Sequence, residues 1–575
     1  MKTRLAFAGI LLLGVGAIVV SEKRKLDVPP SPNAILYLVA DTEQELTRLP
    51  VSFTRMSDKE EIRIGDDLAR AYSPRLSEGS IRESNVDRQE IEKYISGVGS
   101  RVAANAHRKL PYRFHYVPEA AFINAFALPG GHVFVGAGLL ALMDSEDELA
   151  SVIGHEIEHI DHYHCAERVQ REMALRKIPF GELLGFPIEI FETGYSKDQE
   201  LEADREGVRL AVASGYSASG AVRLFEQFDR LYNEHYRKAK TPQEELSQVA
   251  HQTLEGYFRS HPLPAERIQQ LQKVMMAENW SVRPERDLQV GYIFWAERAA
   301  DVLAEHRYAD AERLARRSIA MHPARVEALK VLADAEFAQA KFRAAADSYR
   351  LAAEADPSNL NLVNAYSHAL AATANRQQAV TEFRAWLKAR KDTQPYTSPI
   401  ALAGLELLAG DNGPAQKLLA GVQAHANNAA PDSVSELGWW YYLAGQYAKA
   451  AEVLGEAVQL RPGDAAVAER LAWAEIETSR YADALEVLSG IDVLASANQY
   501  GVRTHHSDMA WAVAEWRGMQ DAPAIQRFSL AIEMQPEWKN DDWVRANYSQ
   551  TILETVQDLT AAHEARRKKL AAPQS

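Results

Sequence analysis

Residues 124–160 read NAFALPGGHVFVGAGLLALMDSEDELASVIGHEIEHI, and this stretch decides the fold of the first half of the chain. Its first part, NAFALPGGHVFVGAG, is typical of extended structure. Its second part begins with Ser145, followed three residues later by Glu148. This is a capping box, which predicts the start of a helix. We expect that helix to run through the histidines and to continue past His162.

The histidines of this helix have the spacing of a metal site. His155 and His159 are four residues apart, so their imidazoles lie on one face, about 6 Å apart along the helix axis. This arrangement can hold one zinc ion. Glu156 stands next to the first histidine and fits the general base of a zinc peptidase. The alternative is a solvated, charge-rich helix face, since the H-E-x-x-H pattern also arises by chance.

A catalytic zinc site needs a third protein ligand. In one known pattern this ligand stands six residues after the second histidine, where this chain has Cys165. That pattern requires a glycine two or three residues after the second histidine, but Asp161 and His162 occupy those positions. We therefore expect Cys165 to be a buried helix residue and not a ligand.

An acidic residue from a second helix is the other candidate. In YSKDQELEADREG, Ser196 and Gln199 form another capping box, and Glu200 and Asp204 then share one face of the following helix. Glu200 would complete a site of two histidines and one glutamate, with the fourth position left for water. Asp204 would accept a hydrogen bond from a ligand imidazole. Glu202 would point to the other side, and an exposed acidic face is the alternative interpretation.

The extended segment before the helix is a candidate substrate edge. Asn124, Ala125 and Phe126 precede a Pro-Gly-Gly turn at residues 129–131. A strand edge close to the metal could align a peptide substrate by strand addition. An ordinary core strand is the alternative.

The C-terminal half repeats with a fixed period. Tyr308, Phe342 and Arg376 are spaced by 34 residues, as are Tyr447 and Tyr481. Small and large residues recur where the tetratricopeptide repeat places its packing residues. We expect about seven such units, which would form an α-solenoid with a groove for a protein partner. A generic helical bundle would not explain a period shared by small and large residues.

Composition and the N-terminus limit the function classes. The net charge of −15 disfavours nucleic-acid binding. The single cysteine excludes an intrachain disulfide. The uncharged run Leu5–Val20 follows two basic residues and predicts an export signal, either a retained membrane anchor or a cleaved signal peptide. No cysteine stands directly after this run, which excludes a lipoprotein. Residues 34–56 contain two strand-like stretches, and ENWSVRPERD at 278–287 is a predicted linker.

The expected domain organisation follows from these patterns. The predicted segments are an N-terminal anchor or signal peptide at 1–25, a linker and short extension at 26–57, a zinc metallopeptidase domain at 58–275, the tetratricopeptide repeat solenoid at 290–540, and a C-terminal capping helix and tail at 541–575.

The segments NAFALPGGHVFVGAGLLALMDSEDELASVIGHEIEHI, ELEADREG and SHPLPAERI, in this order, resemble the zinc metallopeptidase family of the CAAX prenyl endopeptidases, HtpX and BepA. The added repeats resemble its BepA-like branch. The resemblance implies a mainly α fold, with a zincin-type (gluzincin) domain containing a small β-sheet before the repeats. It also implies one zinc ion per chain on the three ligands above, Glu156 as the base, and His261 as a residue lining the site. His162 and His164 enrich the helix beyond the family pattern, and His162 is expected to be solvated or hydrogen-bonded and not a fourth ligand.

The implied function is that of a periplasmic zinc endopeptidase of the bacterial cell envelope, either tethered by its N-terminal segment or released. It would hydrolyse unfolded or misassembled proteins, while its repeats recruit clients or partners. A catalytically silent repeat scaffold or chaperone in envelope protein assembly is one rival, but the presence of Glu156 beside both histidines disfavours it. A membrane-embedded protease is the other rival. It would need several long apolar spans, which the sequence lacks apart from the N-terminal run.

Overall fold

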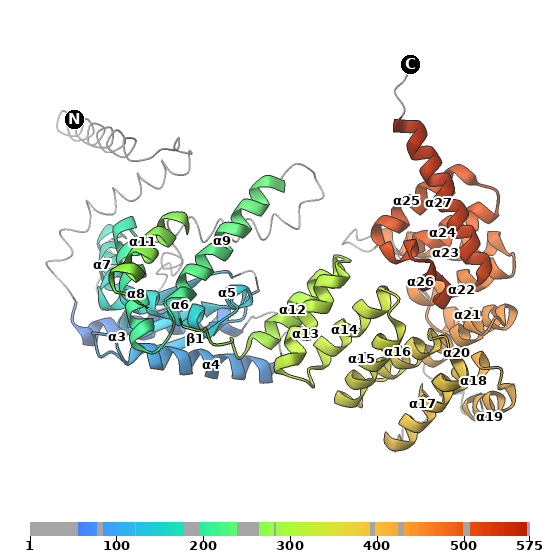
Figure 1. Ribbon diagram of the computed structural model, residues 1–575, viewed down its shortest axis with the longest axis horizontal. Helices are drawn as coiled ribbons and strands as arrows, with labels where there is room; N and C mark the ends of the chain where they lie inside the picture. The colour runs from blue at the N-terminus through green and yellow to red at the C-terminus, as the bar shows by residue number, and fades with distance from the viewer. Residues whose placement is uncertain are drawn as a thin grey trace. The chain divides into compact units, whose positions relative to one another are not determined.

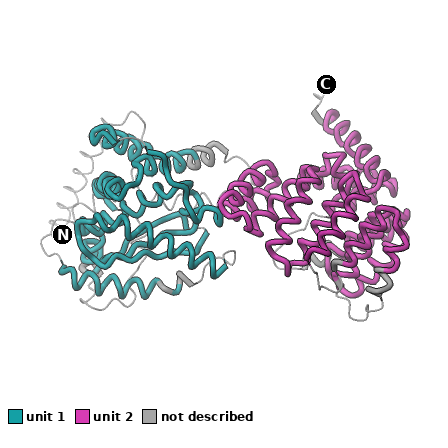
Figure 2. The backbone as a smooth tube through the Cα atoms, turned by 60° about the horizontal axis from the view of Figure 1, so that its bottom comes forward, with its two compact units in different colours: residues 1–294 teal, residues 295–575 magenta. Residues whose placement is uncertain are grey.

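The computed structural model describes residues 56–77, 84–120, 122–176, 195–238, 264–280, 283–390, 397–423, 431–497 and 507–571. The apolar run at the N-terminus and the strand-like stretches expected before residue 56 lie outside this part of the chain. Within the described residues, no helix combines the length and the apolar character needed to cross a bilayer. The chain divides into two compact units, residues 1–294 and 295–575 (Figure 2).

The first unit consists of helices around a small sheet (Figure 1). Its described elements are α3 (Asp58–Ser77), α4 (Asn85–Ala103), β1 (Arg113–Val117), β2 (Ala125–Leu128), a 3₁₀ turn (Pro129–Gly131), β3 (His132–Gly136), α5 (Ala137–Leu142), α6 (Glu146–Asp161), α7 (His164–Arg176), α8 (Lys197–Ala213), α9 (Ser219–Lys238) and α11 (Pro264–Ala277). The mainly α architecture with a small sheet is as the sequence predicts.

The sheet has three strands in the order β1-β3-β2. β2 and β3 are antiparallel and come from the predicted extended segment, whereas β1 pairs parallel to β3 and was not predicted. The turn between β2 and β3 needs glycine, because Gly130 and Gly131 have φ angles of 76° and 107°. Because β2 stands last in the strand order, it forms an edge of the sheet, and α6 and α7 pack against it.

Both predicted capping boxes start helices. The Ser145 side chain accepts from the Glu148 amide at the start of α6, and the Ser196 side chain accepts from the Gln199 amide at the start of α8. The predicted linker at 278–287, however, is not a free connection over residues 283–287. Arg286 N donates to the Asp147 carboxylate at 2.7 Å, because the buried acidic start of α6 needs donors.

The helix that carries the histidines is shorter than predicted. α6 ends at Asp161 and α7 begins at His164. Between them Tyr163 has a φ of 61°, a left-handed conformation that ends the helix although the residue is not glycine. The guanidinium of Arg108 lies 3.9 Å from the centre of the Tyr163 ring and stabilises this turn. The prediction of a continuous helix was wrong because this tertiary contact is not visible in the local sequence.

Two glycines allow α6 and α8 to approach closely. A Cβ atom on Gly154 would lie 2.4 Å from the carbonyl oxygen of Gly207, and a Cβ atom on Gly207 would lie 2.5 Å from the amide nitrogen of His155. Both contacts are with backbone atoms, which cannot rotate away. The small residues therefore set the distance between the helix that carries the histidines and the helix that carries Glu200.

The Gly207→Ala variant should be destabilised by about 1–3 kcal/mol, because the added methyl group must push two helix backbones apart. Gly97 in α4 provides a matched control, since a Cβ atom there would meet only the end of a flexible arginine at 3.9 Å. Gly97→Ala should be neutral or stabilising by about 0.5–1 kcal/mol. Differential scanning calorimetry compares the two, and equal melting temperatures of both variants would contradict the close approach of the helices.

The second unit is built from helix pairs. Over its described residues the helices from α12 to α25 follow one another as seven pairs, and further helices close the C-terminus. The elements are α12 (Gly291–Ala304), which contains the division between the units, α13 (Tyr308–Met321), α14 (Val326–Ala338), α15 (Phe342–Ala355), α16 (Leu360–Ala371), α17 (Arg376–Arg390), α18 (Thr397–Leu408), α19 (Asn412–Gln423), α20 (Pro431–Leu443), α21 (Tyr447–Leu460), α22 (Ala465–Glu477), α23 (Tyr481–Ala497), α24 (Asp508–Arg517), α25 (Asp521–Met534), a 3₁₀ turn (Pro536–Lys539), α26 (Asp541–Asn547) and α27 (Gln550–Ala571).

The 34-residue period coincides with the helix starts. The residues that define the period are the first residues of α13, α15, α17, α21 and α23. Small residues lie where paired helices touch: a Cβ atom on Gly438 would lie 2.6 Å from the Leu454 side chain. One hydrophobic core continues from Leu329 in α14 to Leu559 in α27. The predicted repeat architecture of the C-terminal half is confirmed.

Candidate metal centre

Three donor groups from α6 and α8 converge in the first unit. His155 Nε2 and His159 Nε2 lie 3.1 Å apart. The Glu200 carboxylate lies 3.5 Å from His155 Nε2 and 3.7 Å from His159 Nε2. All three residues are buried, and their donor atoms lie within 4.8 Å of one another. Two imidazole nitrogens and a carboxylate oxygen in this arrangement are a donor set that suits zinc.

The charges around these donors favour a cation. Burial alone would lower the pKa of His155, but hydrogen bonds and charges from Asp204 and Glu200 raise it to about 10. The two buried carboxylates thus stabilise positive charge on the His155 imidazole. A divalent metal ion would supply this positive charge in place of the extra proton on His155, which is lost when the imidazole binds the ion. The residues present therefore fit a zinc ion, and His155, His159 and Glu200 are the ones that would hold it.

His155 is oriented from behind by a buried ion pair. Its Nδ1 atom lies 2.9 Å from Asp204 Oδ1. Arg267 Nε donates to the other oxygen of Asp204 at 2.7 Å. Burial would raise the pKa of Asp204, but Arg267 and His155 hold it below its usual value. The sequence did not single out Arg267, although two carboxylates predicted on one buried helix face already imply a nearby cation.

Tyr195, just before α8, fixes both other donors. Its backbone amide donates to Glu200 Oε1 at 3.0 Å. Its ring stacks on the His159 imidazole with 4.0 Å between the ring centres. The guanidinium of Arg168 lies 3.8 Å from the centre of the Tyr195 ring. Glu200 and His159 are thus held by the same aromatic residue, which the sequence also did not identify.

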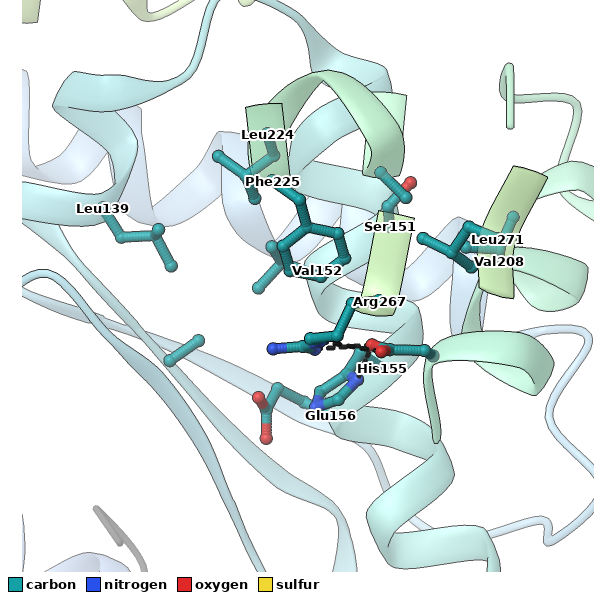
Figure 3. A pocket seen from close by; sticks show the side chains of 13 residues that line it. Leu139, Ser151, Val152, His155, Glu156, Val208, Leu224, Phe225, Arg267 and Leu271 are labelled. Atoms are coloured by element: carbon teal, nitrogen blue, oxygen red, sulfur yellow. Dashed lines mark hydrogen bonds and ion pairs between the residues drawn. The ribbon is translucent and has the colours of Figure 1, made fainter. Parts of the chain in front are cut away.

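Glu156 lines a cavity together with His155 and does not belong to the donor group (Figure 3). The residue is only 4% exposed, and burial raises the pKa of its carboxyl group to about 7. A carboxylate with such a pKa can both take and return a proton near neutral pH. The cavity is otherwise mostly apolar and is lined by Ala125, Leu139, Ser151, Val152, His155, Asp204, Val208, Ala221, Leu224, Phe225, Arg267 and Leu271.

Only one of the three residues predicted at the substrate edge has backbone groups that point away from β3. Gly136 N donates to Asn124 O, so the alternation of an antiparallel pair turns the backbone groups of Phe126 toward β3 as well. The Phe126 ring also stacks on Phe134 in the core. The backbone groups of Ala125 and Ala127 point away from β3 instead, and the Ala127 carbonyl faces the thiol of Cys165, with 3.6 Å between the two atoms. Asn124 and Phe126 therefore do not offer backbone groups to a substrate, whereas the Ala125 backbone points away from β3 and Ala125 lines the cavity with Glu156.

The remaining predicted residues lie as follows. His162 is partly exposed and contacts Glu158, with 3.1 Å between Nε2 and Oε2, so it lies away from the donor group. His164 is buried, and its Nδ1 atom lies 2.9 Å from Nδ1 of His159. Cys165 is buried in α7, outside the donor group. His261 lies outside the described residues.

Residues 89–275 match the sequence profile of the family described as peptidase family M48, and residues 441–495 match that of the tetratricopeptide repeat. A Vibrio cholerae protein assigned as a beta-barrel assembly-enhancing protease is 32% identical over 200 residues, which are 31% of this chain and 38% of that protein. The beta-barrel assembly-enhancing protease of Yersinia pestis is 26% identical over 31% of this chain and 37% of its own. The mitochondrial metalloendopeptidase OMA1 of Schizosaccharomyces pombe is 32% identical over 24% of this chain and 43% of its own.

The matched segments thus cover less than half the length of each of these relatives. Among solved structures, a tetratricopeptide repeat protein from Parabacteroides merdae covers 47% of this chain and 98% of its own at 14% identity, with a TM-score of 0.29. A TM-score this low supports no argument. The family matches fall on the unit that holds the donor group and on the helical repeats.

Proposed function

We propose, from the match of residues 89–275 to peptidase family M48, that this chain is a zinc-dependent endopeptidase of the bacterial cell envelope that hydrolyses unfolded or misassembled proteins. The observation that carries the proposal is the placement of Glu156 beside three converging donors. His155, His159 and Glu200 offer a zinc site, and Glu156 lies next to it without being a donor. A silent scaffold would have no need for a buried carboxyl group in that position.

The chemistry divides between the metal and the protein. A zinc ion on these donors would act as the Lewis acid that polarises the scissile carbonyl and activates water. Glu156 takes the proton from the attacking water and passes it to the leaving amine, for which a pKa of about 7 is suited. Arg267 keeps Asp204 ionised, and Asp204 keeps the Nδ1 proton on His155, so that its Nε2 lone pair faces the metal.

The start of β2, where Ala125 lines the cavity, is the proposed binding place for the substrate backbone. An extended segment that hydrogen-bonds to the backbone of Ala125 would pass along the cavity that Glu156 also lines. The apolar cavity wall, which includes Leu139, Leu224 and Phe225, would take an apolar side chain of the substrate (Figure 3). Strand addition requires an extended chain, which an unfolded protein offers and a folded one does not.

The repeats and the N-terminus would place the enzyme with its clients. Tetratricopeptide repeats usually hold peptides or partner proteins, so we assign client or partner recruitment to residues 295–575. The assembly-enhancing proteases named above support a role in quality control of envelope proteins. The apolar run Leu5–Val20 would export the chain to the periplasm and either anchor it or be cleaved.

An internally quenched peptide with both ends blocked tests the endopeptidase assignment. The full chain should cleave it at internal bonds, which an exopeptidase cannot do, and should degrade an unfolded protein faster than its folded form. A zinc chelator should abolish both reactions, and added zinc should restore them. Mass spectrometry identifies the products. If zinc-loaded protein leaves the blocked peptide and the unfolded protein intact, the scaffold interpretation becomes the better one.

A further inference from the structure

His164 contacts a proposed zinc ligand from the side opposite the metal. Nδ1 of His164 lies 2.9 Å from Nδ1 of His159. His164 is fully buried, and its Nε2 atom lies 3.6 Å from the carboxylate of Glu202. The mechanism above gives no role to either His164 or Glu202. Together with His159 they form a continuous line of polar groups that ends at the proposed metal.

The turn between α6 and α7 creates this contact. In a continuous helix, a residue five positions after His159 would be rotated by about 140° around the axis and could not reach its imidazole. The left-handed backbone of Tyr163 ends α6 and starts α7, which directs His164 back onto His159. The interruption of the helix therefore has a consequence for the site.

The protons of this line follow from the position of the donors. His159 would bind the metal through Nε2, because that atom faces His155 Nε2 and Glu200. A neutral imidazole that uses Nε2 as a ligand carries its proton on Nδ1. Nδ1 of His159 therefore donates to Nδ1 of His164, which must accept. His164 then carries its own proton on Nε2, directed toward the carboxylate of Glu202.

We propose that His164 is a positioning residue for the zinc ligand His159, with Glu202 fixing the tautomer of His164. This inference rests on the proposed zinc site. His155 is backed directly by a carboxylate, whereas His159 is backed by an imidazole and only then by a carboxylate. The two ligands thus have the same protonation but different partners. The Glu202 carboxylate lies 3.6 Å from His164 Nε2, so the end of the line is an acidic group that faces the Nε2 proton.

Substitutions at His164 test the hydrogen bond separately from the packing. Loss of a partner behind a ligand histidine typically weakens metal binding by ~10- to 100-fold. His164→Leu fills similar space but offers no acceptor, so its zinc dissociation constant should rise by about that factor. His164→Asn places an amide oxygen where Nδ1 stands and should restore most of the affinity. His162→Asn is the matched control, because His162 contacts Glu158 and lies 3.8 Å from Glu202, so the variant disturbs the surroundings of the line without contacting a ligand.

The readouts are zinc affinity, by competition with a chromophoric chelator, and the visible spectrum of the cobalt-substituted protein. The inference is supported if the leucine variant binds zinc weakly and has a shifted cobalt spectrum, while the asparagine variant has nearly the affinity and the spectrum of the wild-type protein. A His164→Leu variant with the zinc affinity of the wild-type protein would overturn the inference. So would a folded His164→Asn variant that binds zinc as weakly as His164→Leu does. If the wild-type protein binds no zinc, the proposed function fails together with this inference. If the wild-type protein binds zinc and cleaves peptide, but no substitution at His164 changes the zinc affinity, only this inference fails.

Discussion

The Glu156→Gln variant should bind zinc and peptide as the wild-type protein does, and should hydrolyse the peptide at least ~100-fold more slowly. The substitution keeps the size of the side chain but removes the group that takes the proton from water. General-base contributions are typically ~10²- to 10⁴-fold, and here the same carboxyl group also serves the leaving amine. Because Glu156 is not one of the converging donors, metal content should not change. Steady-state kinetics with parallel zinc analysis measure both quantities.

Glu158→Gln is the matched control for this experiment. Glu158 lies on the same helix and is fully buried, but it faces His162 and not the cavity. An amide of the same shape can still accept a hydrogen bond from His162 Nε2, which lies 3.1 Å from Glu158 Oε2. The control should turn over peptide like the wild-type protein. If Glu156→Gln and the wild-type protein turn over peptide at the same rate and contain the same amount of zinc, the result contradicts the proposed mechanism.

The second large effect concerns the metal. Glu200→Ala and His155→Ala should each fail to retain stoichiometric zinc, because two remaining donors do not form a stable site. A Lewis acid is worth several kcal/mol, and about 1.4 kcal/mol corresponds to a tenfold change in rate, so hydrolysis should fall by more than ~100-fold. Elemental analysis after dialysis and peptide hydrolysis measure the two losses.

Glu206→Ala on the same helix is the control for these ligand variants. Glu206 pairs with Arg205 and Arg209 near the surface and does not belong to the donor group. It should retain both zinc and activity. Full zinc content in Glu200→Ala would show that another residue is the third ligand, and circular dichroism separates loss of metal from loss of fold.

The parts of the structure that depend on local pattern were predictable. Capping boxes at Ser145 and Ser196 gave the starts of α6 and α8, since a cap is made by residues close in sequence. A period of 34 residues gave the starts of several repeat helices, because each repeat packs mainly against its neighbours. The spacing of the candidate ligands placed them on single helix faces. Their roles stay predictions, which the variants above test.

The parts that depend on distant contacts were not predictable. α6 ends early because Arg108, far away in sequence, packs on Tyr163. β1 is a short strand that exists only because β3 pairs with it, and its five residues carry no strong pattern of their own. Arg267 joins the site from α11, and Gly207 matters only once α6 lies against it. His164 looked like an addition to a helix surface, but the turn before it directs the side chain to His159.

Titration of the metal-free protein with zinc tests the central claim most directly. Chelator-treated protein should be folded and inactive toward the blocked, internally quenched peptide. As zinc is added, hydrolysis should rise in proportion and stop rising at one zinc ion per chain, and Glu156→Gln should bind the same amount without gaining activity. Hydrolysis that persists in fully metal-free protein, or that does not respond to zinc, would contradict the account of this chain as a zinc endopeptidase built on His155, His159 and Glu200.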